Sequence, residues 1–134
     1  MKFRYKKLRQ GLLRPIIPVG VSYRGKTITQ EVLIDSGADI CIFDAEIGEA
    51  IGIDIESGEV HEVGGVTGEK QPYFSHVVTM TVGGWPYTIE VGFSRHLAKM
   101  GHGLVGQKGF FEQFKVQFDL QKEEIELKPH QMVE

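Results

Sequence analysis

The residues best suited to catalysis form one short stretch, Asp35-Ser36-Gly37-Ala38-Asp39. It follows the apolar run Val32-Leu33-Ile34, whose β-branched residues predict a buried strand. Ser36 and Gly37 allow a turn after this strand, so Asp35 would lie where an ionisable group costs desolvation free energy unless a partner uses it. An Asp in an ordinary turn is the simple interpretation, and a carboxylate for acid–base catalysis is the functional one.

Other kinds of site find less support in the sequence. The chain contains five histidines, at His61, His76, His96, His102 and His130. Their spacing is not that of metal ligands, and there is no glycine-rich phosphate loop and no supportable Ser-His-Asp order, so neither a metal nor a cofactor is expected. The single Cys41 excludes an internal disulfide, fits a reducing cytoplasm and is expected to be a small buried residue.

The elements that must position Asp35 are predicted to be strands and tight turns. Strands over 16–22 and 27–34 are joined by a hairpin turn, and the second strand carries Asp35 at its end. A short strand over 40–43 leads to Asp44, a plausible N-cap for a short helix over 45–51. The remaining expected strands cover residues 60–63, 73–82, 87–93, 103–106, 115–120 and 124–128, with one or two helical turns over 109–114.

A glycine-rich turn joins two of these strands. Its residues are Gly64, Gly65, Val66, Thr67 and Gly68. Three glycines in five positions give a hairpin tip whose backbone can closely approach a ligand. Without the Asp35 stretch, a plain connecting loop would be the preferred interpretation.

Length and composition indicate one globular domain. At 134 residues, with 41% hydrophobic and 25% charged residues, the chain can bury a proper core. We expect a basic N-terminal extension over 1–11, the domain over 12–129 and a tail over 130–134. No apolar run approaches the ~20 residues of a membrane span, and the N-terminus has no signal-peptide core, so a cytoplasmic location without membrane contact is expected.

Charge is distributed unevenly along the chain. Residues 1–30 contain eight Lys and Arg and no acidic residue, whereas all 18 Asp and Glu lie in the remainder. A basic arm can bind nucleic acid or anionic lipid. More often it is a solvated edge strand whose cations discourage stray pairing, so nucleic acid is not a favoured partner.

Three features, in this order, resemble the retropepsin family of retroviral-type, single-domain aspartic peptidases. They are the Asp35–Asp39 loop after a strand hairpin, the glycine-rich hairpin where the family has its flap, and Leu104-Val105-Gly106 before a short helix at Phe110-Phe111. The resemblance covers roughly residues 12–128. It implies an all-β fold with one or two short helices: a closed-barrel-like acid-protease fold with one lobe per chain and the active site at a C2 dimer axis.

The resemblance also explains why one Asp-Ser-Gly motif matters. Hydrolysis of an amide by water needs a base and an acid, and two carboxylates about 3 Å apart supply both because they share one proton. The chain has no second such motif; Glu56-Ser57-Gly58 lacks the Asp and the apolar lead-in. A two-lobed monomer is therefore excluded, and the second Asp35 must come from another copy of the chain through a twofold axis.

The resemblance assigns roles to the site residues. Asp35, Ser36 and Gly37 would form the catalytic loop, with Ser36 hydrogen-bonded across to the partner loop. Ala38 and Asp39 would bind substrate together with the flap residues Gly64, Gly65, Val66, Thr67 and Gly68, which would cover an extended peptide.

Two departures from the family pattern leave a second function open. Cys41 stands where the family usually has Ser or Thr, and Gln107-Lys108 stand where it often has Arg followed by Asp or Asn. In retroviral enzymes that Arg helps to support the active-site loop and the dimer. The main hypothesis is a homodimeric, metal-independent aspartic endopeptidase, and the alternative is a non-catalytic peptide-binding or dimerisation module in which Asp35 is structural.

Overall fold

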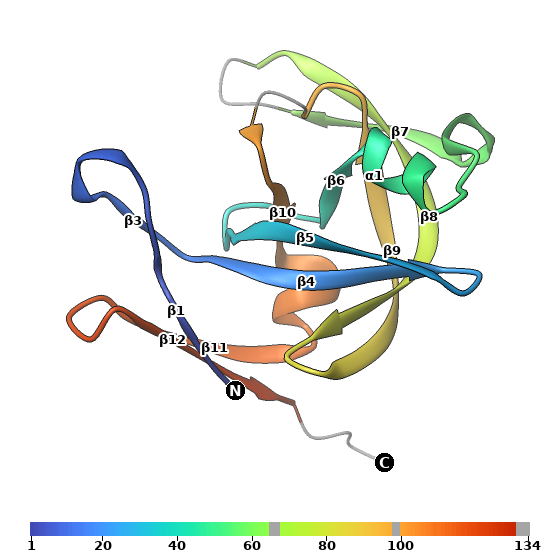
Figure 1. Cartoon of the computed structure of the whole chain (residues 1–134). Helices are drawn as coiled ribbons and strands as arrows, with labels where there is room; N and C mark the ends of the chain where they lie inside the picture. Colours follow the sequence, from blue (N-terminus) through green and yellow to red (C-terminus); the bar gives the residue numbers. More distant parts are fainter. Residues whose placement is uncertain (65–67, 98–99, 131–134) are drawn as a thin grey trace.

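The structure, a computed structural model, describes residues 1–64, 68–97 and 100–130. Within these residues most of the secondary structure is β-strand (Figure 1). The strands are β1 (Lys2–Arg4), β2 (Lys6–Lys7), β3 (Leu13–Arg14), β4 (Ile16–Tyr23), β5 (Lys26–Ile34), β6 (Ile42–Asp44), β7 (Glu59–Gly64), β8 (Lys70–Val82), β9 (Trp85–Ser94), β10 (Gly103–Val105), β11 (Phe114–Asp119) and β12 (Glu124–Pro129). The helical elements are η1 (Arg9–Gly11), α1 (Ala45–Ala50), η2 (Ile55–Ser57) and η4 (Gln107–Phe111). In the described part of the chain, no helix is long and apolar enough to cross a membrane.

Seven strands form the main sheet, in the order β4-β5-β10-β6-β9-β8-β7. Its long strands β4 and β8 also pair with each other, from Gly20 opposite Thr81 to Ser22 opposite Thr79, and this pairing closes the sheet into a barrel. The prediction of an all-β, closed-barrel-like fold with short helices is therefore confirmed. β10 lies between β5 and β6, so the chain that follows β10 emerges beside the chain that follows β5.

The core fills the barrel with apolar side chains from the inward-facing positions of the strands. In β4, Ile17, Val19 and Val21 are buried while Pro18 between them is exposed, the alternation expected of a half-buried strand. The largest fully buried side chains are Phe43, Phe93, Phe110 and Phe114. Burial of these groups is the main contribution that holds the barrel together.

The short helix α1 forms as predicted. Asp44 is its N-cap and accepts a hydrogen bond from the Glu46 N–H at 3.1 Å. Gly48 lowers helix propensity, but a Cβ there would lie 2.7 Å from Ile55 Cδ1 and 2.9 Å from Phe93 Cε1. The glycine therefore lets the helix pack closely on the barrel.

A second, three-stranded sheet has the order β1-β12-β11. The Met1 amino group donates to the Leu127 carbonyl at 3.0 Å, and β1 pairs with β12 along its whole length. Residues 2–4, assigned from the sequence to the basic extension, thus form an edge strand of this sheet. Arg4 lies 3.8 Å from Glu123, so part of the uneven charge distribution is compensated within the chain. The division into extension, domain and tail stays a prediction, and residues 131–134 of the tail lie outside the described residues.

Two details differ from the sequence expectations. The late helical element is Gln107–Phe111 rather than 109–114, and its first part is not regular helix, because Lys108 and Gly109 have non-helical backbone angles. The apolar alternation of β11 does not lead to burial at its far end: Phe118 is 43% exposed, and Leu120, just after the strand, is 61% exposed. The reason is that β11 is an edge strand of the small sheet.

Candidate active site

The Asp35 loop begins where β5 leaves the core. Ile34 is buried and Asp35, the next residue, is half-buried. The Asp35 N–H donates to the Val105 carbonyl at 3.0 Å, and the Ala38 N–H donates back to the Asp35 carbonyl at 3.1 Å. The first bond fastens the loop to β10, and the second closes a tight turn over residues 35–38.

The carboxylate of Asp35 is held within its own turn. Its Oδ1 accepts a hydrogen bond from the Gly37 N–H at 2.9 Å. A Cβ built on Gly37 would lie only 3.2 Å from the same oxygen, so a side chain there would crowd the carboxylate. The Asp-Ser-Gly order therefore has a local reason: the Asp accepts from its own turn, and the Gly leaves room for it.

The chain that leaves β10 braces the other side of the loop. The Gln107 N–H donates to the Ala38 carbonyl at 2.8 Å, and the Lys108 N–H donates to the Asp39 carbonyl at 2.9 Å. These bonds require close backbone contact, since a Cβ at Gly106 would lie 2.3 Å from the Ala38 carbonyl oxygen. Gly106 is thus part of the support of the loop.

The side chain of Gln107 completes this support. Its Nε2 donates to the Ser36 carbonyl at 2.7 Å. The sequence marked Gln107 as a departure from the family pattern but did not reveal this contact. The available signal was its position directly after Gly106, the residue that brings the two backbones together.

Cys41 connects the end of the loop to η4 from inside the barrel. It is fully buried, as expected, and its thiol donates to the Lys108 carbonyl at 3.6 Å. Burial raises the pKa of Cys41 to about 11, with the negative charge of Glu112 adding to the effect and a backbone hydrogen bond at Gly106 opposing it. A thiol in this state is a poor nucleophile near neutral pH.

The predicted loop residues are all brought together. Ser36, Gly37 and Asp39 are exposed, while Ala38 is partly covered. A hollow of about 420 Å³ opens beside them, lined by Asp39, Gln107, Lys108, Phe111 and Glu112. Of the loop residues 35–39, Asp39 is the one that lines this hollow.

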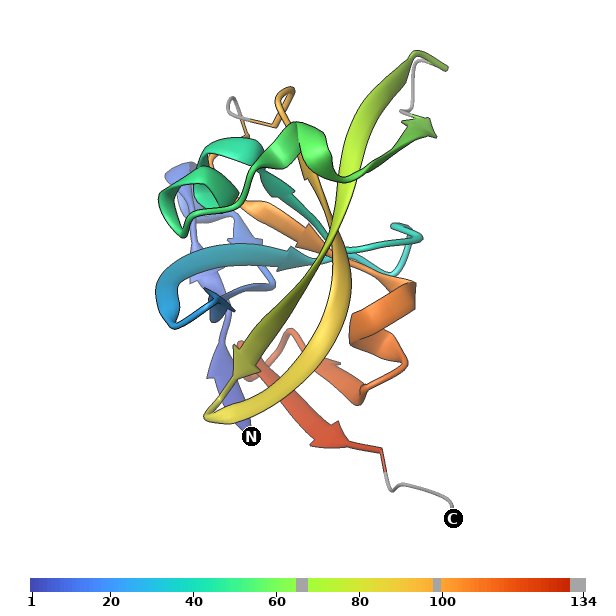
Figure 2. The same ribbon diagram turned by 90° about the vertical axis from the view of Figure 1, so that its right-hand side faces the viewer.

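The predicted flap corresponds to the hairpin of β7 and β8. The two strands pair from Glu59 opposite Ser75 to Gly64 opposite Lys70, and the hairpin extends well beyond the barrel (Figure 2). In both views it lies on the same side of the barrel as the loop after β5 (Figure 1 and Figure 2). Gly64 and Gly68 are exposed at its end, and Gly68 has a φ of 81°. Gly65, Val66 and Thr67 lie outside the described residues.

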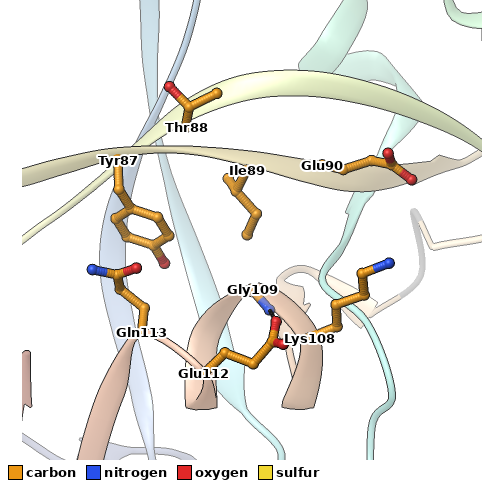
Figure 3. Close-up of a pocket in the computed structure, with 8 residues that line it drawn as sticks. All are labelled: Tyr87, Thr88, Ile89, Glu90, Lys108, Gly109, Glu112 and Gln113. Carbon is orange, nitrogen blue, oxygen red and sulfur yellow. Dashed lines mark hydrogen bonds between the residues drawn. The ribbon is translucent and has the colours of Figure 1, made fainter. Parts of the chain in front are cut away.

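A separate cavity of about 250 Å³ lies between β9 and η4 (Figure 3). Ile89 points from β9 toward Gly109 on η4, and Tyr87 points from β9 toward Gln113. The Gly109 N–H donates to the Glu112 carboxylate at 2.8 Å. The Tyr87 hydroxyl is buried and has no hydrogen-bond partner among the described residues, and its burial raises the pKa of Tyr87 far above the usual range. No residue of the Asp35–Ala38 turn lines this cavity.

The described part of the chain holds no group of three or more His, Cys, Asp or Glu side chains placed to bind a metal ion. The acid–base chemistry that the site offers is that of the Asp35 carboxylate.

Comparison with known proteins agrees with this geometry. A model of the aspartyl protease family matches residues 19–108, which include the Asp35 loop, the β7–β8 hairpin and Gln107. A retropepsin-like aspartic protease from Rickettsia conorii is similar in structure, with a TM-score of 0.64, 14% identity, and coverage of 93% of this chain and 97% of that one. The EIAV protease in complex with the inhibitor HBY-793 is also similar, with a TM-score of 0.52, 19% identity, and coverage of 75% and 88%. No curated protein sequence matches the chain.

Proposed function

This chain belongs to the aspartyl protease family, and we propose that it is a metal-independent aspartic endopeptidase whose active site is shared between two copies of the chain. The observation that carries the proposal is the half-buried carboxylate of Asp35, held by the Gly37 N–H at 2.9 Å at the end of β5. Such a group occurs once per chain, because the sequence holds one Asp-Ser-Gly motif. A carboxylate dyad therefore needs a second copy.

In the proposed dimer the two Asp35 carboxylates share one proton. The ionised carboxylate takes a proton from the attacking water, and the protonated one gives its proton to the leaving amide nitrogen. Ser36 would bond across to the partner loop and hold the two carboxylates together. Activity should peak on the acid side of neutrality, because the dyad fails once both carboxylates ionise.

The substrate we propose is an extended peptide. It would lie between the Asp35 loop and the β7–β8 hairpin, in contact with Gly37, Ala38 and Asp39 below and residues 64–68 above. The position of this hairpin on the same side of the barrel as the loop supports this arrangement. Main-chain hydrogen bonds to both sides would hold the peptide as an added strand.

A mixed-dimer experiment tests the shared site directly. Wild-type and Asp35→Asn chains are mixed in equal amounts until the subunits have exchanged, which size-resolved labelling verifies. If each site needs Asp35 from both chains, the mixture keeps about a quarter of the activity of wild type at the same total concentration. About half the activity would mean that each chain has its own site.

The same reagents separate an enzyme from a non-catalytic binding module. An enzyme loses all cleavage in pure Asp35→Asn, and wild type binds a statine inhibitor that mimics the transition state. A module would bind extended peptides equally well with and without the Asp35 carboxylate, and would cleave none of them.

A further inference from the structure

We propose that Gln107 is a positioning residue that orients the Asp35 carboxylate through the peptide unit between Ser36 and Gly37. Two hydrogen bonds form the connection. The Gln107 Nε2 donates to the Ser36 carbonyl at 2.7 Å, and the Gly37 N–H donates to Asp35 Oδ1 at 2.9 Å. The carbonyl and the N–H are the two ends of one planar peptide unit and point in opposite directions. Fixing the carbonyl therefore fixes the direction of the N–H.

This peptide unit needs an external support. Ser36 and Gly37 are both exposed at the tip of a turn, and a glycine after the peptide bond allows more than one orientation of that bond. The bond from the Ala38 N–H to the Asp35 carbonyl closes the turn around this unit but touches neither its carbonyl nor its N–H, so a direct restraint on the Ser36 carbonyl has to come from outside the turn. The Gln107 side chain supplies that restraint.

The backbone of Gln107 is itself held in place. Its own N–H donates to the Ala38 carbonyl at 2.8 Å, and the close contact at Gly106 holds this part of the backbone against the loop. A carbonyl oxygen only accepts, so the side-chain amide must present its NH₂ group to Ser36. The hydrogen bonds on either side of one peptide unit also polarise it and strengthen each other.

The consequence for catalysis rests on the proposed function. A hydrogen bond to one carboxylate oxygen fixes the orientation of the carboxylate and therefore which oxygen faces the water. Because Gln107 acts on the loop backbone rather than on substrate, its loss should lower kcat on the order of 10- to 100-fold with little change in KM.

The test compares Gln107→Met, which keeps the length of the side chain and removes the donor, with Gln107→Arg, which restores a donor. Gln117→Met, at an exposed position on β11, is the matched control. The primary readout is the NMR signal of the Gly37 amide. We expect its proton resonance to move upfield and its hydrogen exchange to accelerate in Gln107→Met, and both to stay close to wild type in Gln107→Arg and Gln117→Met. If Gln107→Met does not fold, Gln107→Glu at neutral pH replaces it, since a carboxylate has no proton to donate.

This readout is independent of proteolysis. An unchanged Gly37 signal in the donor-less variant overturns the role of Gln107, even if wild type cleaves peptides as proposed. A shifted Gly37 signal in a protein that cleaves no peptide supports the role of Gln107 and refutes the proposed function instead. A shifted signal with reduced kcat and rescue by Gln107→Arg supports both.

Discussion

Adding one methyl group at Gly106 should displace the candidate catalytic loop. A Cβ there would lie 2.3 Å from the Ala38 carbonyl oxygen and 2.7 Å from the Ile40 carbonyl oxygen. Both atoms belong to the backbone, so no side-chain rotation relieves the overlap. The loop would have to move by about 1 Å to restore an ordinary contact, and in a close-packed protein such a shift is transmitted to its neighbours.

The expected cost has two parts. Overpacking of this kind lowers stability by about 1–3 kcal/mol, and the 2.8 Å bond from the Gln107 N–H to the Ala38 carbonyl would weaken, which costs about 1 kcal/mol more. We therefore expect Gly106→Ala to lower the free energy of unfolding by about 3 kcal/mol. A displacement of about 1 Å in a catalytic loop can also reduce kcat about 100-fold.

Gly20→Ala is the matched control for this experiment. Gly20 lies in β4, its φ is outside the left-handed region, and the nearest atom to an added Cβ is Thr81 Cβ at 3.5 Å, an ordinary contact. Replacing a glycine by alanine where the backbone permits it stabilises a protein by about 0.4–1 kcal/mol. Urea unfolding measures both variants, and cleavage of one peptide at saturating concentration gives kcat.

The result that would refute this reasoning is similar behaviour of the two variants. If the free energies of unfolding of Gly106→Ala and Gly20→Ala agree within about 0.5 kcal/mol, the close approach at Gly106 does not exist. If Gly106→Ala is destabilised but keeps its kcat, the loop that it displaces does not carry the catalytic group.

Three further predictions concern groups outside the Asp35–Ala38 turn. Tyr87→Phe should raise the free energy of unfolding by about 1 kcal/mol in urea, because it removes a buried hydroxyl without a partner among the described residues; a loss of stability would mean that the hydroxyl is bonded. Cys41, whose pKa is raised to about 11 by burial, should react with iodoacetamide far more slowly in the folded protein at neutral pH than in urea, and rapid labelling of the folded protein would contradict this. Arg95 lowers the pKa of Glu56 through a 2.7 Å hydrogen bond. The pair therefore contributes its full stability above the ordinary pKa of Glu, and this contribution is lost as the pH falls through the lowered pKa of Glu56. The thermal stability of wild type should therefore exceed that of Arg95→Gln at neutral pH but not in strong acid, and added salt should reduce the difference; equal gaps at both pH values would refute the pairing.

The parts of the fold that the sequence predicted are those with local signals. The hairpin that carries Asp35 follows from alternating apolar residues and a turn, and α1 follows from the Asp44 cap. The pairing of β10 with β5 has no such signal, because it brings 103–105 beside 32–34 across most of the chain. The pairing of β1 with β12 is equally non-local: the basic residues of the arm are typical of an edge strand, but nothing in residues 2–4 indicates which strand they pair with.

The same distinction applies to the site. The Asp35 loop was found because the residues that form it are adjacent, and its own bond from Gly37 is a local one. The role of Gln107 was not predicted, because its partner is a backbone carbonyl 71 positions earlier. Every residue type has such a carbonyl, so the identity of residue 36 does not indicate the contact. A contact between a side chain and a distant backbone atom leaves no direct pattern in a single sequence, and the position of Gln107 directly after Gly106 indicates only that it lies near the loop.

The two departures from the family pattern do not by themselves favour a non-catalytic module. Cys41 and Gln107 lie on opposite sides of the contact between the Asp35 loop and η4, and each side chain donates to a backbone carbonyl of the other segment: Cys41 to Lys108, Gln107 to Ser36. A hydrogen bond to a backbone carbonyl depends on a donor at the right place rather than on one residue type, so a thiol or a neutral amide can fulfil that requirement. The bonds that contact Asp35 directly, to Val105 and from Gly37, are made by the backbone, and Gln107 reaches the second of them only through the peptide unit between Ser36 and Gly37. The catalytic hypothesis therefore depends on the mixed-dimer experiment, not on the identity of residues 41 and 107.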